Sequence, residues 1–112
     1  MTDLYILDDQ HTIVPYPEED LMEWGKWMKE AKESGRALVA ETTLGAFHVH
    51  THFCGCDHNW EDGSPVLFET LVTEDHERRD LHTQRYCTWA EAEVGHARVC
   101  AELETHPTNQ QQ

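Results

Sequence analysis

Apolar and polar residues alternate with a period that changes several times along this chain, and each change predicts a new element. Residues 4–7 and 12–16 are short apolar runs on either side of the polar residues 8–11, a pattern typical of a hairpin or of two edge strands. Pro15 and Pro17 end the second run, because proline has no backbone N–H to donate to a strand ladder. The first sixteen residues are therefore expected to form two short strands.

A helix is predicted next. Pro17 and the acidic residues 18–20 are typical of a helix start. Apolar side chains then recur at spacings of three and four, and they form one stripe made of Leu21, Trp24, Met28 and Ala31. Gly35 is expected to end this helix as its C-terminal cap.

From residue 36 the period becomes that of strands. Residues 37–43 and 46–54 flank a Leu-Gly pair, which predicts antiparallel neighbours joined by a tight turn. Two further strands are expected at residues 66–73 and 81–87, on either side of a charged turn. The loop over residues 55–65 contains Trp60, and we expect that ring to fold down onto the core.

The last element is predicted to be a helix from residue 88 to about residue 104. Thr88 and Glu91 match a capping box, in which each side chain satisfies a free backbone N–H. The expected buried stripe of this helix consists of Trp89, Ala92, His96, Val99 and Leu103. His96 is interpreted as a hydrogen-bonded packing residue, and residues 107–112 are expected to be a disordered tail.

This order of elements predicts the α+β class, with an antiparallel sheet of about four to six strands and two helices packed on one face. Residues 1–106 are expected to form a single domain. An edge strand at residues 37–43 or 81–87 gives the chain a possible route to a homodimer.

The net charge of the chain limits the kinds of partner that it is expected to bind. The chain has 22 Asp plus Glu against 8 Lys plus Arg, a net charge of −14. This charge repels phosphate backbones, so direct nucleic-acid binding is disfavoured and proteins with a basic surface are the expected partners. A nucleotide-binding role remains a further alternative, although few arginines are available to hold an anion.

The expected compartment is the cytoplasm. Residues 1–9 contain no basic segment and no long apolar run, so neither a secretory signal nor a membrane anchor is expected. Without a secretory signal, the four cysteines are expected to be reduced thiols rather than disulfides.

Two segments resemble a family of small proteins from tailed bacteriophages and bacterial prophages. They are VHTHFCGCDHNWEDGSPVLFETLV at residues 49–72 and RYCTWAEAEVGH at residues 85–96. Members of the family typically read VSTVFLGLDHNF, LLFETMVF and RYSTWEEAEAGH. The matching residues are Val49, Thr51, Gly55, Asp57, His58, Asn59, Gly63, Pro65, Phe68, Glu69, Thr70, Arg85, Tyr86, Thr88, Glu91, Ala92, Gly95 and His96. The segment DLMEWGKWM at residues 20–28 is similar to the family's first helix, so the likeness covers nearly the whole chain.

Five potential metal ligands fall on alternate positions, which places them on one side of an extended strand: His48, His50, His52, Cys54 and Cys56. Side chains two apart on a strand are nearly 7 Å apart, so at most two of the five can share a zinc ion, with a third ligand from a neighbouring strand. The resembling family usually has Val, Leu and Leu in place of His52, Cys54 and Cys56. Buried or solvated strand residues are therefore the favoured interpretation, and zinc is the alternative.

A second set of candidates for ligand or partner binding comes from the shared polar positions: Asp57, His58, Asn59, Trp60, Glu69, Arg85 and Tyr86. An acid, an imidazole and a second acid can support acid-base chemistry. The structural alternative is that Asp57 caps the loop and Glu69 pairs with Arg85 across two strands. No nucleophile, phosphate loop or cofactor motif accompanies these residues, so no catalytic residue and no cofactor is assigned.

These patterns favour a non-enzymatic binding protein of a phage or prophage, which uses its acidic surface to modulate a host or phage protein in host takeover or anti-defence. The alternative is a protein that binds zinc or a small ligand through residues 48–58.

Overall fold

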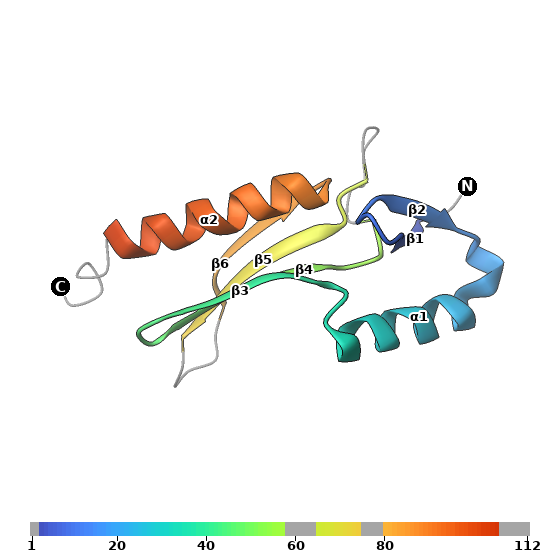
Figure 1. Cartoon of the computed structure of the whole chain (residues 1–112), viewed down its shortest axis with the longest axis horizontal. Coiled ribbons are helices and arrows are strands. Elements are labelled where there is room, and N and C mark those ends of the chain that lie inside the picture. The colour runs from blue at the N-terminus through green and yellow to red at the C-terminus, as the bar shows by residue number, and fades with distance from the viewer. Residues whose placement is uncertain (1–2, 58–64, 75–79, 106–112) are drawn as a thin grey trace.

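The computed structural model describes residues 3–57, 65–74 and 80–105, which form six strands and two α-helices (Figure 1). Strands β1 (Leu4–Leu7) and β2 (Ile13–Tyr16) form an antiparallel hairpin, and a 3-10 turn, η1 (Glu18–Asp20), leads into helix α1 (Leu21–Ser34). A second antiparallel sheet follows, made of β3 (Leu38–Leu44), β4 (Phe47–Phe53), β5 (Phe68–Glu74) and β6 (Asp80–Tyr86) in that spatial order. Helix α2 (Trp89–Thr105) closes the described part of the chain.

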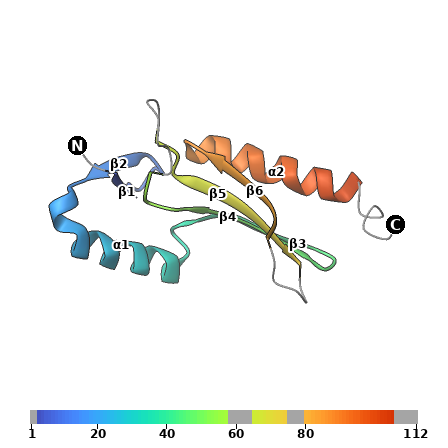
Figure 2. The same cartoon turned by 180° about the vertical axis from the view of Figure 1, so that it is seen from behind.

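The predicted α+β class is confirmed, but the six strands form two sheets and the helices take different positions. Helix α2 runs along one face of the four-stranded sheet and contacts all four of its strands (Figures 1 and 2). Helix α1 instead lies beside the β1–β2 hairpin and packs chiefly on β1. Within the described part of the chain, neither helix covers most of the sheet face opposite α2.

The C-terminal end of α1 and the N-terminal start of α2 have caps at the residues that the sequence predicted. Gly35 is left-handed, with φ of 85°, and its N–H bonds to the Lys32 carbonyl, as expected of a C-terminal cap. At the start of α2, the Glu91 N–H donates to the Thr88 hydroxyl at 3.1 Å. The Glu91 carboxylate accepts from the Cys87 N–H at 3.0 Å, one residue before the position that a capping box uses.

The main core lies where both helices and both sheets meet. Phe53, Leu67 and Phe68 are fully buried there, and Met28 from α1 and Ala92 from α2 cover them. Burying one phenylalanine side chain stabilises a fold by about 1.5 to 3 kcal/mol relative to leaving it exposed. This cluster therefore fixes the position of β4 and β5 between the two helices.

The predicted stripe of α2 is confirmed by the burial of Ala92, His96 and Val99. The stripe of α1 is only partly buried. Met28 and Ala31 are in the core, whereas 56% of Leu21, the first residue of the helix, is exposed.

Three expectations fall outside the described residues: Trp60 as the anchor of its loop, the charged turn around residues 75–79, and the disordered tail at 107–112. Within the described residues, neither helix is long and apolar enough to cross a membrane.

Candidate functional site

The open face of the four-stranded sheet carries the histidine row that the sequence predicted. Along β4, Val49, Thr51 and Phe53 are buried, and the alternate positions, His48, His50 and His52, lie partly exposed on the opposite side. The row ends with the strand. Gly55 is left-handed, with φ of 79°, and Cys56 beyond it forms an isolated bridge with Leu4 of the hairpin. Cys56 is therefore no continuation of the row.

The histidines of this row have different partners. His50 Nδ1 lies 3.0 Å from a carboxylate oxygen of Glu41, its neighbour on β3. His48 Nδ1 lies 3.4 Å from the Thr43 hydroxyl, also on β3. His52 instead faces β5, where its Nε2 atom is 4.0 Å from Glu69 Oε1. Among the described residues, His52 is the histidine of this row that belongs to a group of three potential metal ligands.

His52, Cys54 and Glu69 form a compact group of three potential metal ligands, whose nitrogen, sulfur and oxygen atoms all lie within 4.8 Å of one another. All three residues are partly buried. Glu69 was selected from the sequence as an acid, but its place beside His52 and Cys54 depends on the register of β4 and β5, which pairs His52 with Glu69.

Burial keeps the two neutral members of this group uncharged. Burial and, to a smaller extent, the nearby Glu69 carboxylate raise the pKa of the Cys54 thiol to about 12. Burial also lowers the pKa of His52, against the opposite effect of Glu69. At neutral pH the group therefore consists of a thiol, a neutral imidazole and a carboxylate.

The second carboxylate oxygen of Glu69 pairs with Arg85. Arg85 Nε on β6 donates to Glu69 Oε2 at 3.1 Å, which is the cross-strand pairing expected from the sequence. The carboxylate of Asp57 accepts a hydrogen bond from the Val66 backbone N–H at 2.9 Å, so Asp57 fixes the start of the segment that leads into β5. These two acids therefore hold different parts of the structure. The other candidates in this region, His58, Asn59 and Trp60, lie outside the described residues.

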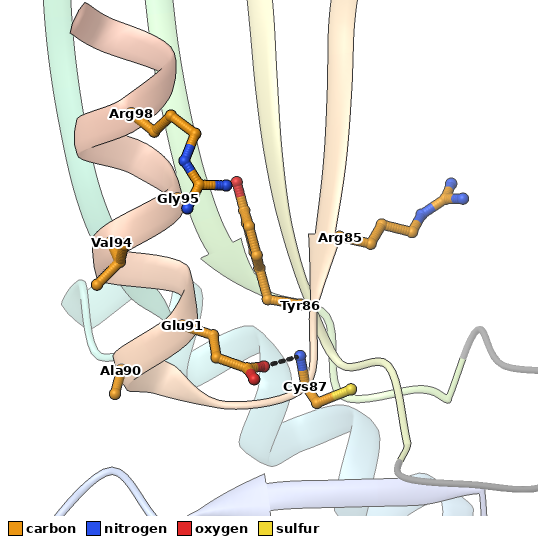
Figure 3. Close-up of a pocket in the computed structure, with 8 residues that line it drawn as sticks. All are labelled: Arg85, Tyr86, Cys87, Ala90, Glu91, Val94, Gly95 and Arg98. Carbon is orange, nitrogen blue, oxygen red and sulfur yellow. Dashed lines mark hydrogen bonds between the residues drawn. The ribbon is translucent and has the colours of Figure 1, made fainter.

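Tyr86, the last of the predicted binding residues, lies in a pocket between β6 and α2 of about 510 Å³. Figure 3 shows its ring lying along α2 beside Gly95, with Arg98 near the hydroxyl end. The hydroxyl is buried and has no hydrogen-bond partner among the described residues. The pocket is lined by Arg85, Tyr86, Cys87, Ala90, Glu91, Val94, Gly95 and Arg98.

A buried polar network, whose partners the sequence did not reveal, joins α2 to the sheet. His96 Nδ1 is 2.8 Å from the Thr51 hydroxyl, and its Nε2 is 2.8 Å from the Thr42 hydroxyl. The Thr51 hydroxyl also bonds to that of Thr70. Both ring nitrogens of His96 thus have a hydrogen-bond partner, which supports its interpretation as a packing residue.

No family model matches the chain, and no curated protein or solved structure is significantly similar to it. The resemblance to phage and prophage proteins therefore stays a prediction. Several residues that carry it make internal contacts: Thr51, Thr70 and His96 bond to one another, and Glu69 pairs with Arg85. The pattern therefore coincides with groups that hold this fold together, whatever the protein binds.

Proposed function

We propose that this protein is a small acidic binding protein of a phage or prophage, and that it acts without catalysis on a host or phage protein with a basic surface. The net charge of −14 supports this proposal, because it steers a compact domain toward positive surfaces.

The observation that carries the proposal is an exposed apolar pair within an acidic segment at the start of α1. Met22 is 80% exposed and Leu21 is 56% exposed. The acidic side chains around them are also exposed: Glu18, Glu19, Asp20 and Glu23. An apolar centre with a polar rim is the usual composition of a protein–protein interface.

The two kinds of side chain have separate roles in this proposal. Leu21 and Met22 supply apolar area that becomes buried on binding and slows dissociation. The carboxylates attract the partner and increase the association rate, an effect that salt screens.

The partner is first isolated from host lysate with the wild-type protein, and its affinity is then measured with purified variants. Leu21→Gln/Met22→Gln is expected to weaken binding at least about tenfold, since central interface residues often contribute more than about 1.4 kcal/mol. Glu19→Gln/Glu23→Gln is expected to lower the association rate and the salt dependence. The matched controls lie on α2, where Val94 is 59% exposed and Glu93 and Glu104 are also exposed.

Val94→Gln and Glu93→Gln/Glu104→Gln are expected to leave affinity within about twofold of wild type, as surface changes away from an interface do. The proposal fails if binding is insensitive to salt, or if the α2 variants weaken it as much as the α1 variants.

A further inference from the structure

We propose that His52, Cys54 and Glu69 bind a single transition-metal ion of the zinc class on the open face of the four-stranded sheet. The inference rests on the proximity of their ligand atoms, all within 4.8 Å of one another, and is independent of any protein partner.

The fold explains why these three residues meet although a regular strand separates alternate side chains too widely. Strand β4 ends at Phe53, and the backbone turns at the left-handed Gly55, directly after Cys54. Its backbone N–H donates to the Leu67 carbonyl at 2.7 Å, next to the start of β5. The register of β4 and β5 then places Glu69 directly opposite His52.

The chemical nature of the three ligand atoms indicates which metal ions they would bind. One imidazole nitrogen, one sulfur and one carboxylate oxygen suit zinc or cobalt, whereas magnesium and calcium prefer oxygen ligands alone. Metal binding releases the Cys54 thiol proton to solvent, and the resulting thiolate and the Glu69 carboxylate together match the two positive charges of the ion. The nearby Arg85 guanidinium is already paired with Glu69 Oε2.

The three ligand atoms need to move only slightly closer together to bind one ion. Tetrahedral zinc with bonds of about 2.0 to 2.3 Å holds its ligand atoms roughly 3.2 to 3.8 Å apart. Glu69 Oε1 is 4.0 Å from His52 Nε2, so side-chain rotation of these partly exposed groups brings them within reach. Arg85, which holds the other carboxylate oxygen, acts as a positioning residue of the kind that commonly orients a metal ligand.

Three protein ligands leave a fourth coordination position for water or an added ligand. His52 also lines an apolar pocket of about 230 Å³, together with Lys32, Gly35, Ala37, Leu38 and Phe53. The pocket thus adjoins one of the three ligands.

The test is a Co²⁺ and Zn²⁺ titration of the reduced, untagged full chain. Cobalt is expected to bind once per chain and to give the near-ultraviolet charge-transfer band of a thiolate ligand, and zinc is expected to displace it. Cys54→Ser is expected to abolish the band. His52→Gln and Glu69→Gln are each expected to lower affinity more than about 100-fold, since even loss of a residue that only orients a ligand costs about 10- to 100-fold.

The matched controls are Cys56→Ser and His48→Gln, which alter the same residue types nearby and are expected to keep both the band and the affinity. Circular dichroism checks that each variant folds. If the ligand variants do not fold, the proposal is tested on the wild-type protein alone. Cobalt must then give the charge-transfer band, and zinc must shift the imidazole NMR signals of His52 but not those of His48. Absence of the band, loss of binding in the controls, or an unshifted His52 overturns the proposal.

Discussion

The ring of Tyr86 occupies the space that a side chain at Gly95 would need. A Cβ atom added at Gly95 would lie 2.2 Å from Cε1 and Cζ of that ring and 2.3 Å from its hydroxyl oxygen. The absence of a side chain at this one position of α2 therefore allows the helix to approach β6 closely, and it explains a glycine inside a helix, where glycine is otherwise unfavourable.

Gly95→Ala is expected to destabilise the protein by about 1 to 3 kcal/mol, because overpacking outweighs the gain of about 1 kcal/mol in helix propensity. The measurement is urea unfolding followed by circular dichroism. Gly25→Ala is the matched control, since Gly25 lies within α1 and an added Cβ meets nothing within 4 Å. It is expected to stabilise by about 0.5 to 1 kcal/mol. A stabilised Gly95→Ala variant would contradict the close approach.

Thr51→Val is expected to cost about 1 to 3 kcal/mol, because it leaves His96 Nδ1 and the Thr70 hydroxyl buried without their shared partner. Thr43→Val on the exposed side of β3 serves as the control and is expected to change stability by less than about 0.5 kcal/mol. In a His96→Leu background the Thr51 substitution should cost clearly less. Simple additivity of the two changes would argue against a coupled network.

The stability of the protein is expected to fall as pH drops below about 6.5, the usual pKa of histidine. Burial, and to a smaller extent His50, lowers the pKa of His96 in the folded chain. The unfolded chain then takes up a proton at a higher pH than the folded chain, so stability is present above the unfolded pKa and is lost below it. Urea unfolding of wild type and His96→Gln from pH 8 to 5 isolates this contribution. Burial also lowers the pKa of His52, so the His52→Gln variant is measured in the same series. Parallel curves for wild type and His96→Gln would contradict the prediction.

The elements of this fold could be predicted because their signals are local. Gly35 at the end of α1 needs only its own backbone geometry, and the buried stripe of α2 needs only helical spacing. The exposure of the apolar residues at the start of α1 could not be predicted in the same way. Leu21 has the spacing of a core residue, but its burial depends on which distant segments pack against the start of α1, and no local pattern fixes these.

The candidate metal group shows the same limit. Alternation along β4 places His48, His50 and His52 on one face, as predicted. Which of them meets a carboxylate of β5 depends on strand register and on where β4 ends, and both are set by contacts between distant segments. The grouping of His52 with Cys54 and Glu69 is therefore a property of the tertiary structure and of no local sequence pattern.

His11 links the β1–β2 hairpin to α2, and its removal is expected to loosen that connection. Its ring stacks on Trp89 with centroids 3.6 Å apart and planes within 4°. The backbone of His11 has φ of 65°, which asparagine also tolerates. His11→Asn is therefore expected to remove the stacking without adding backbone strain, at a cost of about 0.5 to 1.5 kcal/mol. The check is a double-mutant cycle by urea unfolding: in a Trp89→Leu background the His11 substitution should cost almost nothing, and an equal cost in both backgrounds would show that the stacking contributes no stability.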